Sequence, residues 1–422
     1  MKDMKFVFDF EVKDPNIRKL PYPYLGAISI SNDIDYTNFQ FFEEFMKFLN
    51  TTRKTKFGQG LGLEITSSFF FYSTTPYSFS YFSGAKPKSK KSSIANRMED
   101  YIISGWMDAN HAYGDFDAGP FFTREHAIRC YEILENLGVS VEIFITHGNK
   151  NNIQNVGRDA IWYHRGDVKG HPAYHVDLMK KHGVKFVWTD NMVREYCYIP
   201  TSIFKRLLLK IKRKILLEDI FKGGVQILKE LTLQDGSKFK GFWRFRGTGK
   251  YAPILPSLEY QLNKIDWQDF YKNNRIIIIY QHLGIIDRKN GQCIQATCEN
   301  VCSSNKGVLK PFYFLTREYH EGKLWIAGLK RLLNYIDVIS NVQIKFDKNL
   351  SAIFIMYNNE KINKTPNEFF QGLTIYINKN DIKLEKLKVY HEDKSLNYVI
   401  NPPDETGKIS ITIPLKRLDD IW

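Results

Sequence analysis

The sequence predicts an α/β fold with a parallel sheet or barrel, followed by a small β-sandwich-like domain. Strand-like and helix-like segments alternate through the first three-quarters of the 422-residue chain, a pattern typical of parallel sheets covered by helices. After about residue 340, the pattern changes to short alternating strands separated by turn residues. We therefore expect an α/β domain over residues 1–340 and a β-rich accessory domain over residues 341–422.

The alternating segments can be followed along the chain. Residues 27–31 read as an apolar strand, and apolar side chains recur at helical spacing within residues 36–50. Thr123 and Gly138 have the residue types that start and stop a helix. Further strands are expected over residues 61–73, 139–146, 184–189 and 275–282, and further helices over residues 171–183 and 321–336.

The charge and the terminal sequence restrict the partners and the compartment. The chain has 60 Lys and Arg against 46 Asp and Glu, a net charge of +14, which favours acidic partners such as a nucleotide-linked sugar, an anionic polysaccharide or an anionic membrane face. An AT-biased genome would leave the same excess, and we expect no nucleic-acid partner. Five cysteines fit a reduced compartment, and no signal peptide or 18-residue apolar run is found, so a soluble, cytoplasmic protein is expected.

A basic amphipathic segment over residues 202–218 interrupts the alternation. Such a helix could lie on an anionic membrane as a peripheral contact, or it could cover the body of its own domain.

Ionisable side chains recur where the predicted strands end. Loops that follow the carboxyl ends of parallel strands converge on one rim, so these side chains should meet there. Histidine and carboxylate groups are the ligands of catalytic zinc-type sites, in which water becomes a nucleophile near neutral pH. In chain order the strand-end residues are Asp33, Asp35, His111, Asp115, Asp117, His147, Asp190, Arg246 and His282.

Residues 26–285 resemble the polysaccharide deacetylase-like superfamily. The stretch "ISISNDID" resembles its first motif, a strand that ends in a pair of aspartates, and "GHPAYHVDL" is similar to its His-x-x-x-His metal motif through His171 and His175. Arg246 in "GFWRFRGTG" stands where the family has an arginine that steadies the base, and "IIIIYQHLG" resembles the last motif through His282. The resemblance implies a distorted (β/α)7-type barrel and a metal-dependent carbohydrate deacetylase-like hydrolase.

The resemblance also implies a role for each catalytic residue. Asp33 would be the general base, Asp35 would bind the metal, His282 would be the acid and Arg246 would orient Asp33. A divalent ion is expected as the cofactor, with zinc as first choice.

The sequence departs from the family pattern in two places. Ile34 separates the two aspartates, and Pro172 directly follows His171, which is the usual arrangement beside a helix N-cap. The other metal ligands therefore stay open among His111, His147 and His175, with His171 in reserve.

Polar and aromatic residues near the same strand ends are candidates for sugar binding. Amide side chains both donate and accept hydrogen bonds, as sugar hydroxyl and N-acyl groups do, and Trp188 could stack on a sugar ring or fill the barrel floor. The expected substrate-binding residues are Asn149, Asn155, Asp115, Asp167, His171, Trp188 and Asp190.

The predicted reaction is removal of an N- or O-acetyl-type group from a sugar, in making or modifying a surface polysaccharide. One alternative keeps the barrel and makes it a glycosidase, with Asp33 paired with Asp190 or Asp115. Another is a non-catalytic carbohydrate-binding or assembly protein on a degenerate barrel.

Overall fold

The computed structural model describes most of the chain. The described residues are 4–119, 122–158, 160–200, 202, 207, 225–247, 251–303, 307–357, 365–377 and 384–422. The predicted basic helix over residues 202–218 falls almost wholly outside them. Among the described residues, no helix is long and apolar enough to cross a membrane.

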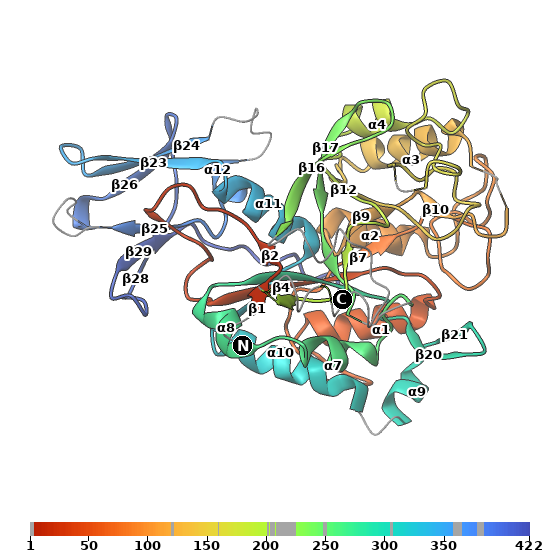
Figure 1. Cartoon of the computed structure of the whole chain (residues 1–422), viewed down its shortest axis with the longest axis horizontal. Coiled ribbons are helices and arrows are strands. Elements are labelled where there is room, and N and C mark those ends of the chain that lie inside the picture. Colours follow the sequence, from red (N-terminus) through yellow and green to blue (C-terminus); the bar gives the residue numbers. More distant parts are fainter. Residues whose placement is uncertain are drawn as a thin grey trace.

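A curled, mostly parallel sheet of 11 strands forms the centre of the described structure (Figure 1). Within the sheet, only β16 and β17 pair antiparallel among the described strands. In sheet order the strands are β13 (Val193–Arg194), β18 (Arg244–Phe245), β19 (Ile276–Gln281), β4 (Gly26–Asn32), β7 (Ser67–Phe69), β9 (Met107–His111), β11 (Ile143–Ile145), β12 (Phe186–Trp188), β17 (Lys238–Phe242) and β16 (Leu228–Thr232), with β22 (Leu324–Ile326) beside β4.

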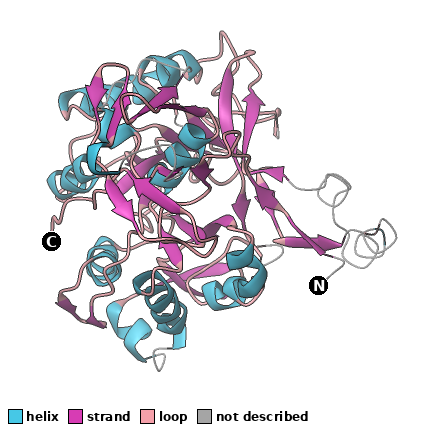
Figure 2. Ribbon diagram, turned by 90° about the vertical axis from the view of Figure 1, so that its left-hand side faces the viewer, coloured by secondary structure: helices cyan, strands magenta, loops and turns pink. Residues whose placement is uncertain are grey.

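Helices lie beside the strands, on the left and along the bottom of the view in Figure 2. All seven residues of β4 are buried, which explains why its sequence is almost continuously apolar or small. The helices are α1 (Phe39–Asn50), α2 (Ala95–Ser104), α3 (Arg124–Asn136), α4 (Val176–Lys181), α7 (Ser257–Leu262), α8 (Trp267–Lys272), α9 (Cys298–Ser303), α10 (Lys310–His320), α11 (Leu329–Ile339) and α12 (Pro366–Phe369).

The structure confirms some element boundaries and corrects others. Helix α3 begins after Thr123, which forms a capping box with His126, as the N-cap prediction required. Residues 321–336 were predicted to be one helix, which is wrong: the buried Leu324–Ile326 segment pairs with β4 as a strand, and α11 starts only after Gly328.

The described strands within residues 342–412, together with one strand from the N-terminal part of the chain, form two four-stranded sheets, which project to the left in Figure 1. One sheet contains β23 (Val342–Asp347), β24 (Ala352–Tyr357), β26 (Lys388–His391) and β27 (Lys394–Ser395). The other contains β28 (Val399–Asn401), β29 (Ile409–Thr412), β25 (Thr374–Ile377) and β3 (Ile17–Arg18). Because β3 comes from the N-terminal part of the chain, the second sheet draws on both ends of the sequence.

Short two-stranded pairs complete the described strands. They are β1 (Met4–Phe6) with β14 (Tyr198–Pro200), β2 (Phe8–Asp9) with β15 (Val225–Gln226), β5 (Lys54–Thr55) with β6 (Gly58–Gln59), β8 (Tyr72–Ser73) with β10 (Gly114–Asp115), and β20 (Ile285–Lys289) with β21 (Gln292–Gln295).

The N-terminus of α11 is capped by side chains of the central sheet region. The backbone N–H of Gly328 donates to Glu64 Oε1 at 3.1 Å, that of Leu329 to Thr66 Oγ1 at 3.0 Å and that of Lys330 to Asp108 Oδ2 at 2.8 Å. These bonds satisfy donors that the helix leaves free, and they fix α11 against the sheet. Burial raises the pKa of Asp108 to about 7.

We expect Asp108 to make the stability of the protein depend on pH. The pKa of Asp108 is about 4 in the unfolded chain and about 7 in the folded protein. Between these two pH values the folded protein keeps a proton on Asp108 that the unfolded chain has lost. The free energy of unfolding should therefore fall as the pH rises. Asp108→Asn removes this titration. The free energy of unfolding of the variant minus that of the wild type should therefore be about 3 kcal/mol larger at pH 8 than at pH 4. Urea unfolding at both pH values measures the difference, and a difference independent of pH would contradict the assignment.

Candidate metal and acid–base site

Asp35 lies at the centre of a cluster of histidines. It follows β4, and the histidines come from other strand ends: His111 is the last residue of β9, His147 follows β11 and His282 follows β19. Asp35 Oδ1 is 2.9 Å from His147 Nδ1, while Asp35 Oδ2 is 3.5 Å from both His111 Nδ1 and His282 Nε2. The structure thus brings together five strand-end residues, counting Asp33, that the sequence analysis selected.

His111 is held as a neutral imidazole. Its Nε2 lies 3.2 Å from the carbonyl oxygen of Thr146, which can only accept, so Nε2 carries the proton and the Nδ1 lone pair faces Asp35. Burial lowers the pKa of His111 to about 4, which keeps the ring neutral at neutral pH. Ser68 Oγ lies 3.3 Å from the same Nδ1 and can donate to it, which agrees with an unprotonated nitrogen there. A neutral imidazole with one unprotonated nitrogen is the form that binds metals.

His147 lies between carboxylates on both edges of its ring. Its Nδ1 contacts Asp35, and its Nε2 is 3.6 Å from Asp115 Oδ1 and 3.5 Å from Asp117 Oδ1. Burial alone would lower the pKa of His147, but the charge of Asp35 and the interactions with Asp115 and Asp117 raise it well above its ordinary value. In the absence of another cation, His147 therefore carries the positive charge that these carboxylates require.

Arg244, and not Arg246, contacts Asp33. Arg244 NH1 donates to both oxygens of Asp33, at 3.0 and 2.9 Å, and neither side chain is more than 1% exposed. The guanidinium carbon of Arg244 lies 3.6 Å from the ring centre of Trp188 and 3.8 Å from that of Tyr280. The prediction for Arg246 is corrected here, because this residue pairs with Glu195.

His282 presents one ring nitrogen to the site. Its Nδ1 lies 2.9 Å from the carbonyl oxygen of Pro253 and must donate to it, so Nε2 is the nitrogen that faces Asp35 at 3.5 Å. This orientation suits a group that exchanges a proton with a molecule bound beside Asp35.

Backbone strain is concentrated next to these residues. Tyr36 directly follows Asp35 and has a φ of 53°, and Ala112 and Tyr113 directly follow His111 with φ of 49° and 61°. Positive φ is costly for residues other than glycine and is found preferentially at functional sites. Both strands therefore end in tight turns that aim Asp35 and His111 into the cluster.

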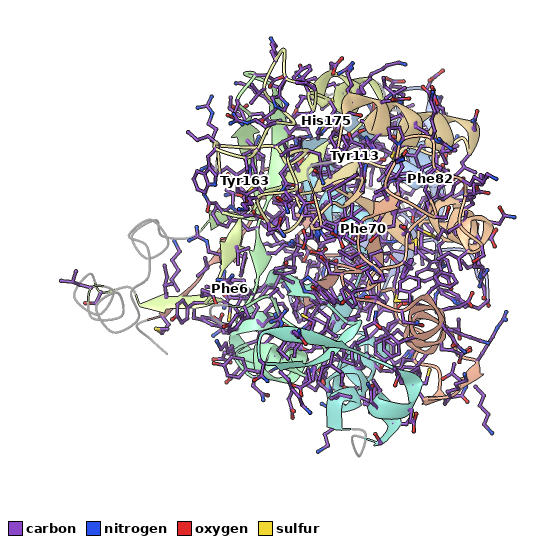
Figure 3. The ribbon with its side chains drawn as sticks, turned by 90° about the vertical axis from the view of Figure 1, so that its right-hand side faces the viewer. Phe6, Phe70, Phe82, Tyr113, Tyr163 and His175 are labelled. Carbon is purple, nitrogen blue, oxygen red and sulfur yellow. The ribbon has the colours of Figure 1, made fainter. Side chains whose placement is uncertain are left out.

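Two predicted metal ligands lie elsewhere. His175 is buried, with its ring centre 4.9 Å from that of Tyr113, and Figure 3 shows it next to Tyr113 and away from Phe70, whose ring contacts His111 and His147. The Nδ1 of His175 donates to the carbonyl oxygen of Ala173, and burial lowers the pKa of His175 to about 4. His171 lies in the loop before α4, where its Nδ1 accepts a hydrogen bond from the backbone of Ala173.

Most of the predicted substrate-binding residues support the loops of the site. The side chain of Asn155 bonds both backbone groups of His147, and Asp115 faces the same ring. Asp167 is buried and accepts hydrogen bonds from Gly157 and Gln234. Asp190 accepts a hydrogen bond from Thr146, Trp188 covers Arg244, and Asn149 lies on an exposed turn.

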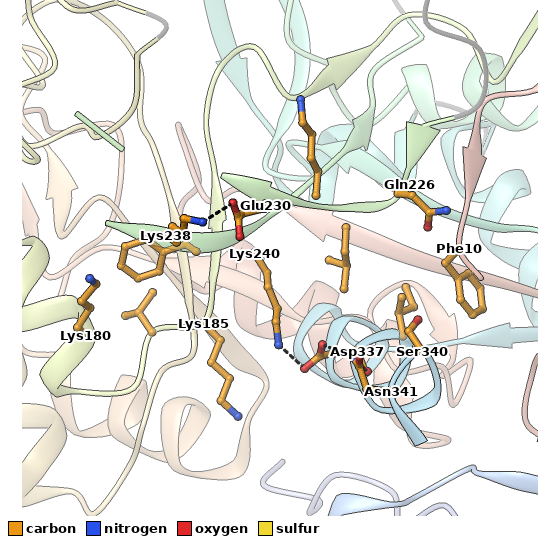
Figure 4. Close-up of a pocket in the computed structure, with 15 residues that line it drawn as sticks. Phe10, Lys180, Lys185, Gln226, Glu230, Lys238, Lys240, Asp337, Ser340 and Asn341 are labelled. Carbon is orange, nitrogen blue, oxygen red and sulfur yellow. Dashed lines mark hydrogen bonds and ion pairs between the residues drawn. The ribbon is translucent and has the colours of Figure 1, made fainter. Parts of the chain in front are cut away.

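A separate cavity of about 540 Å³ lies away from this cluster, between β16, β17 and α11 (Figure 4). Its charged lining includes Lys240, which bonds Asp337 at 2.7 Å, and Lys238, which pairs with Glu230 at 3.0 Å. Because none of its lining residues belongs to the Asp35 cluster, we assign this cavity no part in the chemistry of the strand-end residues.

The strand-end cluster fits a divalent cation. One carboxylate oxygen of Asp35 with ring nitrogens of His111 and His147 forms a set of three ligand atoms that all lie within 4.8 Å of one another. Asp35 Oδ2 and His147 Nε2 are buried and have no hydrogen-bond partner among the described residues. Arg244 pairs with Asp33, and the carboxylates of Asp35, Asp115 and Asp117 meet around His147, so an added positive charge would be favourable. This donor set of one oxygen and two nitrogens is typical of catalytic zinc.

Comparisons with known proteins give little support for any function. No family model matches the sequence, and the search of curated proteins gave no match. Among solved structures, the 4-α-glucanotransferase from Thermococcus litoralis is similar over 73% of this chain and 40% of that chain, with 11% sequence identity and a TM-score of 0.36. This chain thus spans less than half the length of that enzyme.

Proposed function

We propose that the protein is a metal-dependent hydrolase that removes an acyl group, of the N- or O-acetyl type, from a sugar. The observation that carries the proposal is the contact of Asp35 with His111, His147 and His282 beside the buried Asp33–Arg244 pair. Metal-dependent deacylation uses a cation, a base and an acid around one reacting carbonyl, and this cluster has residues for each role.

Asp35, His111 and His147 would hold the cation, with zinc as first choice. When bound, the ion supplies Lewis acidity that polarises the acyl carbonyl and makes water a stronger acid. Asp115 and Asp117 face the far edge of the His147 ring and would fix its orientation, as carboxylates commonly do behind a ligating histidine.

Asp33 would accept a proton from the attacking water, and Arg244 would orient Asp33. Arg244 NH1 donates to both oxygens of Asp33, which fixes the carboxylate, and the stacked rings of Trp188 and Tyr280 prevent the guanidinium from turning away. His282 Nε2 would donate a proton to the departing sugar nitrogen or oxygen.

The strand order supports a distorted (β/α)7 barrel of the polysaccharide deacetylase-like type. Seven parallel strands, β4, β7, β9, β11, β12, β17 and β19, follow one another both in the chain and in space. The β18 extension of β17 pairs with β19, and β19 pairs with β4. The four catalytic strand ends would then lie on one rim.

The proposal is tested by elemental analysis and by assay of the purified protein. We expect a stoichiometric divalent ion, and release of acetate from acetylated sugars that stops after chelation and returns with zinc. If the protein carries no such ion and cleaves glycosidic bonds, the proposed deacylase is wrong and the alternative of a glycosidase with paired carboxylates is supported.

Binding of the ion should release protons. Because the pKa of His147 is raised well above its ordinary value, this ring is protonated in the metal-free protein at neutral pH, and it must lose a proton before it can bind a metal. We expect release of about one proton at pH 7, and an affinity that rises roughly tenfold for each pH unit below the pKa of His147. Calorimetric titration with zinc in two buffers of different ionisation enthalpy measures the release. A value near zero would exclude His147 as a ligand.

A further inference from the structure

Two stacked tyrosines lie at the rim of the proposed site. Tyr36 directly follows Asp35, and its ring lies 5.4 Å from that of Tyr77 with an angle of 15° between the planes. The side chain of Tyr36 is half-buried, whereas Tyr77 is 52% exposed. The pair therefore leads from the Asp35 cluster to solvent, with Tyr77 on the outside.

Three chain segments hold this pair in place. The backbone N–H of Tyr36, in its strained turn, donates to Ser78 Oγ at 3.0 Å, and Gln295 Nε2 donates to the carbonyl oxygen of Tyr77 at 2.7 Å. Gln295 comes from the β20–β21 hairpin at the lower right of Figure 1. An aromatic side chain at positive φ is a costly arrangement, and here its result is a fixed and accessible ring pair.

The inner ring belongs to the same electrostatic environment as the carboxylates. Tyr36 lies close enough to Asp115, Asp117 and Asp35 to interact with their charges. The hydroxyl of Tyr36 can donate a hydrogen bond near the cluster. An apolar ring face with polar groups at its edge matches a pyranose ring, which also has an apolar face and a hydroxyl edge.

We propose that Tyr36 and Tyr77 form a platform for a polysaccharide chain, on which Tyr77 stacks a pyranose ring one or two units from the sugar that is deacylated. The inference rests on the proposed function and specifies its substrate as a polymer. Because Tyr77 stacks on the neighbour of Asp35 and is the more exposed ring of the pair, we expect a lone sugar at Asp35 to lie beyond the reach of Tyr77. A ring pair fixed before binding also loses little conformational entropy when the sugar binds.

The test compares Tyr77→Ala with wild type on acetylated glucosamine oligomers from monomer to hexamer. In the wild type, KM should fall as the oligomer lengthens. In Tyr77→Ala this gain should be lost, with KM for the hexamer raised about tenfold, because one aromatic stack contributes about 1.4 kcal/mol. Tyr260→Ala is the matched control, since Tyr260 on α7 is 53% exposed and should leave the length dependence intact. Equal length dependence in wild type and Tyr77→Ala would overturn the inference.

Binding without turnover separates the platform from the proposed chemistry. In native gels cast with acetylated polysaccharide, the inactive Asp35→Asn protein should be retarded, and the Asp35→Asn/Tyr77→Ala protein should not. If Tyr77-dependent retardation is seen but the wild type releases no acyl group, the platform stands and the proposed function is overturned. Tyr77-dependent binding of a nucleotide-linked monosaccharide in preference to the oligomers would overturn the platform as a polymer site.

Discussion

Replacement of Asp35 by asparagine should leave the protein folded, without a bound divalent ion and without turnover. Asparagine keeps the shape of the side chain but removes the charge that faces His147 Nδ1 at 2.9 Å and His111 Nδ1 at 3.5 Å. Loss of an outer-shell partner costs about 10–100-fold in metal affinity, so loss of the one carboxylate ligand should cost more than about 100-fold. Elemental analysis and acetate release measure the two effects.

Asp177→Asn is the matched control for this experiment. Asp177 is an aspartate of the same size that is largely exposed and pairs with Arg124, so its replacement should change neither metal content nor turnover. Circular dichroism should give native spectra for both variants. Stoichiometric metal in Asp35→Asn would show that Asp35 is not a ligand, whatever the effect on turnover.

The strand-end rule found most of the candidate site from the sequence. Asp33 with Asp35, His111, His147 and His282 come from four separate stretches of the chain, yet each lies at or just after the carboxyl end of a strand of the parallel sheet. Parallel pairing of β19 with β4 and of β11 with β9 brings those ends together. This inference needs only the strand pattern and the direction of the strands, and both can be read from periodicity.

Residue choices that depend on the last one or two positions of a strand could not be made in this way. Arg244 and Arg246 are two apart and so share a face of an extended chain. Only the position where β18 meets β19 decides which arginine reaches Asp33. The prediction that His171 and His175 ligate a metal was wrong for a related reason. Their spacing suits one face of a helix, but α4 begins only at Val176, so neither histidine is part of the helix.

Replacement of Arg244 by methionine should destabilise the protein by about 3–5 kcal/mol, because it leaves the buried charge of Asp33 without a partner. The effect should be seen in urea unfolding, together with loss of turnover. Arg246→Met is the matched control: its pair with Glu195 is partly exposed, and such pairs contribute about 1 kcal/mol or less. If Arg244→Met lowers the free energy of unfolding by no more than Arg246→Met does, the assignment of Arg244 as the partner of the buried Asp33 is contradicted.

A double-mutant cycle with Asp33→Asn separates the lost pair from lost packing. If the cost of Arg244→Met is the unpaired carboxylate, then Asp33→Asn/Arg244→Met should recover about 2–3 kcal/mol relative to the sum of the single changes, since a buried pair can be replaced by uncharged groups at little cost. If the cost comes from the contacts of Arg244 with Trp188 and Tyr280, the two changes should add. Because Arg244 touches Asp33 and both rings, the cycle measures how much of its stabilising effect lies in the ion pair that orients the proposed base.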